Sequence, residues 1–210
     1  MKIVLLTLLL SLYAFANIGT IMALKGKATI QRDTSINAKM GMSIKQSDSV
    51  KTYAHSSVQI MLKDDSVITI GANSSFDFKE YQFDGTRSSQ ASFKIHRGYI
   101  RVLTGKLGKI APNRFRVKTV TALIGIRGTD YSVESLKDKE TIRCYSGSIW
   151  VKLDRGGRHT VDAGKLLEIQ NKSANIKKIT DIPATKSNLP ADLTDMPTPD
   201  VHHQEPYHNY

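Results

Sequence analysis

Residues 58–70 read Val58-Gln59-Ile60-Met61-Leu62-Lys63-Asp64-Asp65-Ser66-Val67-Ile68-Thr69-Ile70, and this stretch predicts a β-hairpin. Two runs rich in β-branched residues flank four polar residues, and aspartate tolerates the backbone conformations of a tight turn. Similar runs recur about every ten residues between Gly, Asn, Asp and Ser. Further strands are expected at 76–78, 91–95, 99–103, 115–118, 131–134, 141–145, 148–153 and 166–169.

No amphipathic helix is expected in the body of the chain, so the predicted fold class is all-β. A weak repeat, Gly-x-apolar-x-apolar, starts at Gly26, Gly98 and Gly147, and each glycine is expected to open a strand after a turn. The repeats are 72 and 49 residues apart, which excludes a regular solenoid. The architecture expected is an irregular β-roll or β-sandwich of many short strands.

Composition agrees with a folded globular body and indicates an anionic partner. The chain has 210 residues, of which 40% are hydrophobic and 23% charged, so collagen-like, coiled-coil and wholly disordered classes fit poorly. Its 30 basic and 19 acidic residues give a net charge of +11. Such a surplus suggests nucleic acid, phospholipid, lipopolysaccharide or acidic glycan as a partner.

The first sixteen residues indicate export. Lys2 precedes an apolar run that ends at Ala14-Phe15-Ala16, the pattern of a signal peptide cleaved after Ala16, although a retained anchor is the alternative. No Cys follows the cleavage site and no transmembrane segment is expected in the mature chain. A periplasmic or secreted location makes nucleic acid a poor partner and favours envelope anions.

The last thirty residues differ from the body. Residues 181–210 contain five prolines and carry a net charge of −4, and a disordered acidic tail is expected there. Residues 17–180, the expected folded domain, hold 28 basic and 14 acidic residues, a net charge of +14. The tail could fold back on this basic body or simply keep the terminus soluble.

Residues 115–133, FRVKTVTALIGIRGTDYSV, resemble the central motif of the FecR domain family. Matching segments occur in order around it, at residues 48–52, 62–70, 98–100, 147–151 and 161–164. The resemblance covers residues 24–170. Val120 stands where the family often has proline, and Asp65 stands where its Asp-Gly-Ser turn has glycine.

The resemblance implies an extracytoplasmic all-β module. Its best-known relatives sense an outer-membrane iron–siderophore receptor and signal to a sigma factor through a cytoplasmic N-terminal arm. Here the expected signal peptide occupies that place, so a stand-alone secreted FecR-domain protein without the sigma-regulator arm is expected. The sequence leaves the partner, any link to iron and the oligomeric state open.

The family signature comprises Gly125, Arg127, Gly128 and Thr129. Both glycines can supply backbone conformations or close approaches closed to other residues. Thr129 is expected to bond to the turn. Arg127 is expected either to pair with Asp130 or to contact an anionic ligand through its planar fork.

A basic strand face is the candidate ligand site. Residues 85–129 contain ten basic residues and no acidic one. Alternation along 97–101 and 114–118 places charges on one strand face and apolar residues on the other. The candidate ligand-binding residues are Arg97, Arg101, Arg114, Arg116, Lys118 and Arg127.

No catalytic residue, metal site or cofactor is predicted. His55, His96 and His159 lie apart with no metalloprotease or serine-hydrolase motif, and a Cys144–His96 pair would need proximity that the sequence does not show. The single cysteine, Cys144, is expected to be a buried thiol. In the tail, potential metal ligands occur at His202, His203, Glu205 and His208, where metal binding would be adventitious.

These features predict a non-catalytic periplasmic binding or sensory-accessory module that contacts an envelope protein. The alternative is a binder of anionic envelope glycan or lipopolysaccharide through the basic strand face. The two differ in salt response, because contacts with polyanions weaken with ionic strength and an apolar protein interface does not.

Overall fold

The computed structural model describes residues 17–170 and 173–179, and it confirms the all-β class. The expected signal peptide, the acidic tail and its histidines lie outside these residues. The strands are β1 (Asn17–Lys25), β2 (Ala28–Gln31), β3 (Ser35–Asn37), β4 (Ser43–Lys45), β5 (Ser49–Thr52), β6 (Ser57–Leu62), β7 (Val67–Ile70), β8 (Ser75–Gln82), β9 (Gln90–Leu103), β10 (Phe115–Lys118), β11 (Ala122–Ser135), β12 (Lys139–Leu153), β13 (Arg158–Asp162), β14 (Lys165–Gln170) and β15 (Ser173–Lys178).

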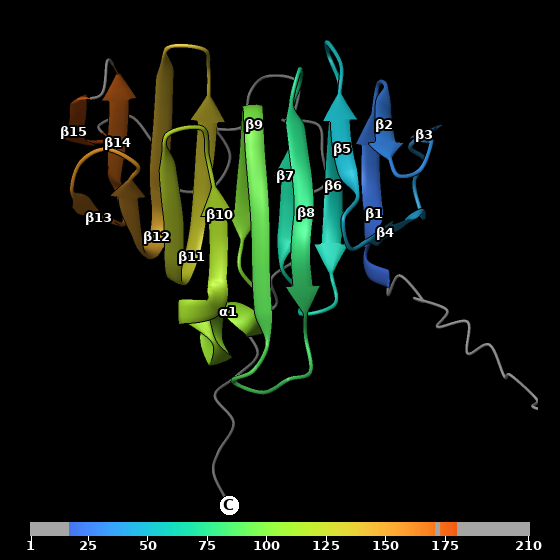
Figure 1. Ribbon diagram of the computed structural model, residues 1–210, viewed down its shortest axis with the longest axis horizontal. Helices are drawn as coiled ribbons and strands as arrows, with labels where there is room; N and C mark the ends of the chain where they lie inside the picture. The colour runs from blue at the N-terminus through green and yellow to red at the C-terminus, as the bar shows by residue number, and fades with distance from the viewer. Residues whose placement is uncertain (1–16, 171–172, 180–210) are drawn as a thin grey trace, which may run out of the picture.

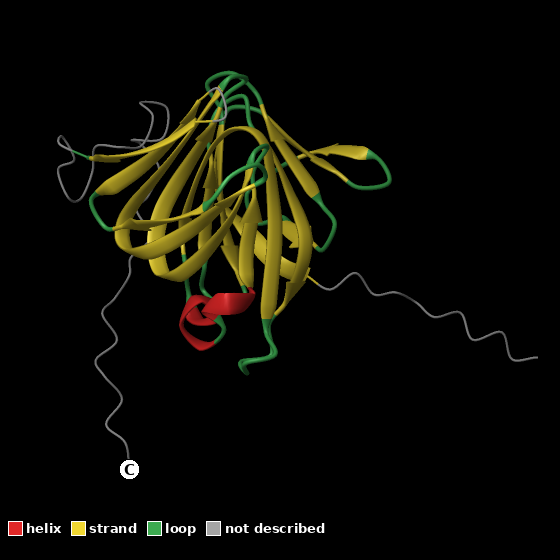
Figure 2. Cartoon of the chain, turned by 60° about the vertical axis from the view of Figure 1, so that its left-hand side comes forward, coloured by secondary structure: helices red, strands yellow, loops and turns green. Residues whose placement is uncertain are grey.

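Hydrogen bonding joins all the strands into one continuous sheet, which is folded over into two layers (Figures 1 and 2). We call layer 1 the order β15-β14-β12-β11-β9-β7-β6-β1-β4 and layer 2 the order β13-β12-β11-β10-β9-β8-β5-β2-β3. The long strands β9, β11 and β12 take part in both layers, with one half in each. The pairing of β9 with β10 is parallel and the other pairings are antiparallel.

Glycines allow the three long strands to pass between layers. Gly98, Gly128 and Gly147 have φ values of +95°, +59° and +73°, in the left-handed region that favours glycine. The bends at Gly128 and Gly147 are packed together, since a Cβ at Gly147 would lie 2.0 Å from the Gly128 carbonyl oxygen.

The expected strand breaks at Gly98 and Gly147 are therefore wrong. Residues 91–95 and 99–103 belong to one strand, β9, and residues 141–145 and 148–153 belong to β12. The glycines bend the chain while the residues on both sides keep their pairing, so the strand turns without ending. Gly26, between β1 and β2, does open a strand as expected.

The core lies between the layers and follows from strand alternation. Phe76, Phe78, Phe93 and Phe115 point inward and are fully or almost fully buried. Their rings meet edge to face, with centroids 5.2 Å apart for Phe76 and Phe78 and 5.5 Å apart for Phe93 and Phe115. Such pairs add to the free energy gained by burying apolar area.

The hairpin at residues 58–70 is confirmed, and its turn anchors a helix that the sequence did not predict. Strands β6 and β7 pair antiparallel, and Asp64 in the turn is fully buried. Its carboxylate accepts hydrogen bonds from the Tyr81 hydroxyl at 2.9 Å, the Ser66 hydroxyl at 2.6 Å and the Leu107 N–H at 3.1 Å. Leu107 belongs to α1 (Lys106–Ile110), which is followed by the 3-10 turn η1 (Pro112–Arg114). Five residues are too few for helical periodicity to be visible.

Neither a membrane-spanning helix nor a metal cluster is found among the residues that the structure describes. No helix there is long and apolar enough to cross a bilayer. Within the same residues, no group of three or more His, Cys, Asp and Glu side chains is placed to hold a metal ion.

Candidate binding surface around Trp150

The outer face of layer 2 gathers cations from four strands. Lys118 on β10 is paired with Lys94 on β9 on one side and with Leu123 on β11 on the other. Leu123 is paired in turn with Lys152 on β12, and Lys152 is paired with Arg158 on β13. Their neighbours in sequence, such as Val117 and Val151, are buried in the core, so this row faces outward. With Arg116 and Trp150 from the adjacent row, these residues define what we call the Trp150 face: Lys94, Arg116, Lys118, Trp150, Lys152 and Arg158.

Trp150 occupies the centre of this face because Gly125 leaves room for it. The two residues are opposite one another on β12 and β11. A Cβ at Gly125 would lie 2.1 Å from Cε2 and 2.2 Å from Cζ2 of the indole, so only glycine permits this packing. The guanidinium carbons of Arg116 and Arg158 lie 4.7 Å and 4.5 Å from the indole centroid, within the range of cation–π contacts.

The charges of the Trp150 face are only partly neutralised. Lys118 forms an ion pair with Asp154. Among the described residues, neither Arg116 nor Arg158 forms an ion pair with a carboxylate. Burial, together with the nearby charge of Arg158, lowers the pKa of Arg116. The centre of the face is therefore a site of unbalanced positive charge.

The structure brings together only two of the six candidate ligand-binding residues, Arg116 and Lys118. Arg101 lies on the outer face of layer 1, where it makes a bidentate contact with Asp130 at 2.9 Å and 2.6 Å. Arg114 lies in η1 and donates to the Gln90 side chain. Arg97 is exposed one residue before the bend at Gly98, and Arg127 is exposed one residue before the bend at Gly128. The expected continuous basic face is thus divided between the layers, because β9 changes layer between Arg97 and Arg101.

Of the remaining signature residues, Gly128 and Thr129 have structural roles at the bend of β11. Asp130 is engaged by Arg101, so the expected pairing of Asp130 with Arg127 is not formed. The Thr129 hydroxyl is buried without a hydrogen-bond partner, contrary to the expectation that it bonds to the turn. Its backbone holds the bend instead: the Thr129 N–H donates to the Thr104 hydroxyl at 2.8 Å, and its carbonyl accepts from the Thr104 N–H at 3.0 Å.

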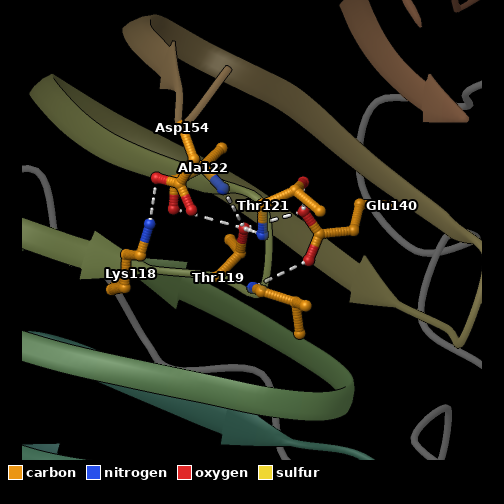
Figure 3. A network of polar contacts seen from close by, with 7 residues as sticks. Lys118, Thr119, Thr121, Ala122, Glu140 and Asp154 are labelled. Atoms are coloured by element: carbon orange, nitrogen blue, oxygen red, sulfur yellow. Dashed lines mark hydrogen bonds and ion pairs between the residues drawn. The ribbon is translucent and has the colours of Figure 1, made fainter. Parts of the chain in front are cut away.

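The buried carboxylate of Glu140 fixes the turn at the C-terminal end of β10 (Figure 3). Glu140 accepts hydrogen bonds from the hydroxyls of Thr119 at 2.7 Å and Ser135 at 2.8 Å, from the Thr121 hydroxyl and from the Val120 N–H at 3.0 Å. These donors come from the β10–β11 turn and from β11. With both carboxylate oxygens engaged, Glu140 acts as a structural anchor for the turn that follows Lys118.

A cavity of about 450 Å³ opens beside Glu140. It is lined by apolar side chains, including Val120, Leu136, Leu153 and Ile169, and by polar residues of the neighbouring turns. Val120 and Leu136 are more than half exposed at its mouth. The polar part of its lining includes Lys137, Asp138 and Lys139.

Cys144 and His96 are not brought together as a catalytic pair. Cys144 is buried, as expected, and its thiol lies 3.4 Å from the Ser146 carbonyl oxygen. Burial, with smaller contributions from Asp130 and Asp162, raises the pKa of the thiol to about 11. His96 lies on the outer face of layer 2 and contacts Asp77 at 2.7 Å.

Sequence reasoning missed four members of the Trp150 face: Lys94, Trp150, Lys152 and Arg158. Lys94 lies within the acid-free interval, and alternation along residues 91–95 was a usable signal for it. The other three lie on β12 and β13, whose register with β10 and β11 depends on long-range pairing. A single tryptophan in an outward position was the one local clue.

Comparison with known proteins confirms the resemblance. Residues 48–150 match the model of the FecR protein family, and the matched segment includes Gly125 and Trp150. No curated protein matches the chain.

Two crystal structures, each of a candidate anti-sigma factor from Parabacteroides distasonis, share its fold. One, at 2.50 Å resolution, has a TM-score of 0.51 and 14% identity, and the other, at 1.65 Å, has a TM-score of 0.51 and 12% identity. Each likeness covers 62% of this chain and 59% of the other. The chain thus matches under two thirds of those proteins, and the likeness concerns the fold.

Proposed function

We propose that this protein is a non-catalytic signalling accessory module of the cell envelope, which acts by binding an envelope protein through the Trp150 face. The FecR domain and the fold shared with candidate anti-sigma factors support the signalling class. A periplasmic or secreted location agrees with the signal-peptide pattern of residues 1–16.

We choose the Trp150 face as the binding surface because Trp150 and two arginines, Arg116 and Arg158, lie together at its centre. Tryptophan and arginine are enriched where binding energy concentrates in protein interfaces. Trp150 is partly exposed and flanked by Arg116 and Arg158, neither of which has a carboxylate partner among the described residues. An acidic patch on a partner would meet both the charge and the apolar indole.

A second candidate function is binding of an anionic envelope glycan or lipopolysaccharide. It is favoured by the row Lys94, Lys118, Lys152 and Arg158, which follows the register across the sheet from β9 to β13. Four steps between neighbouring strands span about 19 Å. A polymer with repeated negative charges could follow such a row.

Salt-resolved capture separates the two functions. The tagged full chain is mixed with detergent-solubilised envelope and washed at about 0.1 M and about 1 M salt, where the Debye lengths are about 10 Å and about 3 Å. We expect a defined protein to survive the high-salt wash, because apolar contacts with Trp150 are not screened. Glycan or lipopolysaccharide that is lost at high salt would support the second candidate instead.

Matched charge reversals test the surface. The double variant Arg116→Glu/Arg158→Glu should retain about tenfold less partner, equivalent to about 1.4 kcal/mol. The control Lys39→Glu/Lys63→Glu has the same net charge and changes two exposed residues outside the Trp150 face. Equal retention by the two double variants would refute the assignment of this face.

A further inference from the structure

The centre of the Trp150 face holds two positive charges close together. The guanidinium carbons of Arg116 and Arg158 are both within 5 Å of one indole centroid, so they lie less than 10 Å apart. Gly125 supports the indole from below, and the strands that carry the two arginines flank β11 and β12. The arrangement is therefore built into the sheet.

Nothing among the described residues balances these charges. The Arg116 side chain donates a hydrogen bond to the carbonyl oxygen of Phe115 at 3.1 Å, and this acceptor carries no formal charge. Two cations held together repel each other, and desolvation of Arg116 adds to the cost. An anionic group that contacts both guanidinium groups would offset this repulsion.

We propose that the cluster of Arg116, Trp150 and Arg158 binds the phosphomonoester group of a phosphorylated envelope sugar. A phosphomonoester carries a charge of about −1.5 to −2 at pH 7, which matches two unpaired guanidinium groups, whereas a carboxylate carries −1. Arginine also presents a planar fork that suits phosphate oxygens. The indole provides an apolar surface beside the charges for the ring of the sugar. This inference rests on the second candidate function, binding of an anionic envelope glycan or lipopolysaccharide through the Trp150 face, and names the chemical group that is bound.

Intrinsic fluorescence gives a direct test, because Trp150 is the only tryptophan of the chain. The purified full chain is titrated with glucose 1-phosphate, inorganic phosphate, glucuronate and glucose. We expect a saturable change with glucose 1-phosphate, at least about tenfold weaker binding of glucuronate and of inorganic phosphate, and no change with glucose.

Variants tie the signal to the two arginines. Arg116→Gln and Arg158→Gln should each weaken glucose 1-phosphate binding about tenfold, which corresponds to about 1.4 kcal/mol. Lys63→Gln, which removes an exposed charge outside the face, should leave it unchanged. Circular dichroism checks folding, and if a glutamine variant fails to fold, Arg116→Lys and Arg158→Lys keep the charge but lose the fork and should weaken binding in the same way.

Several results would overturn the inference. No saturable change with glucose 1-phosphate would refute it, as would glucuronate or inorganic phosphate binding equally well. Tighter binding of a phosphoserine peptide would refute the sugar assignment. If glucose 1-phosphate does not bind but the double variant Arg116→Glu/Arg158→Glu still loses envelope capture, the inference fails and the proposed function stands. If glucose 1-phosphate binds but this double variant captures the envelope partner as well as the unchanged protein does, the proposed function fails and the inference stands.

Discussion

Gly125 makes the position of Trp150 possible, and replacing it should uncouple the indole from the sheet. In Gly125→Ala the new Cβ would lie 2.1 Å from Cε2 of Trp150, so the indole must move. Overpacking costs about 1–3 kcal/mol. Loss of the contacts with Arg116 and Arg158 adds about 0.5–1 kcal/mol each. We expect the free energy of unfolding to fall by about 2–5 kcal/mol.

A double-mutant cycle isolates this effect. In the Trp150→Ala background the clash is absent, and Gly125→Ala should be neutral or stabilising by about 0.5–1 kcal/mol, because alanine loses less backbone entropy than glycine in a strand. Urea unfolding followed by circular dichroism measures all four proteins without relying on the tryptophan. Additivity within about 0.5 kcal/mol would refute the proposed coupling between the two residues.

Three further predictions concern the supporting structure. Val120→Pro should lower the free energy of unfolding by about 1–3 kcal/mol, because proline lacks the N–H that Val120 donates to buried Glu140. The control Val120→Ala keeps this N–H and should change the free energy of unfolding by less than about 0.5 kcal/mol. Thermal unfolding compares the two variants, and equal midpoints would contradict the role of this hydrogen bond. Asp65 has a φ of +64°, in the left-handed region that glycine adopts more easily than alanine. The free energy of unfolding in urea should therefore be about 1 kcal/mol higher for Asp65→Gly than for Asp65→Ala. The reverse order would show that backbone strain does not decide the stability of this turn. Cys144, buried with its pKa raised to about 11, should resist a thiol-specific reagent at about pH 8 and react once the chain is unfolded; rapid reaction of the folded protein would contradict its burial.

The elements that the sequence predicted are those whose signals are local. Alternation and turn chemistry at residues 58–70 define β6, β7 and the turn between them, and the structure has that hairpin. The bends of β9, β11 and β12 were not predictable in the same way. Gly98 and Gly147 look like turn residues, and only pairing on both sides of each glycine keeps the strand continuous.

The candidate site was predicted in part for the same reason. Alternation along β10 placed Arg116 and Lys118 outward, which is a property of one strand. Arg158 reaches Trp150 only because β13 pairs with β12, and Arg101 leaves the face because β9 has already crossed into layer 1. Both facts depend on contacts between distant parts of the chain, which one sequence does not reveal.

Hydrogen–deuterium exchange of the full chain, with and without solubilised envelope, tests most directly whether the Trp150 face is the binding surface. Peptides that cover β10, β12 and β13 should exchange more slowly when the envelope is present, since a bound partner shields their outer face. The variant Arg116→Glu/Arg158→Glu should lose this protection. Protection confined to β1–β6, or equal exchange with and without envelope, would contradict the account.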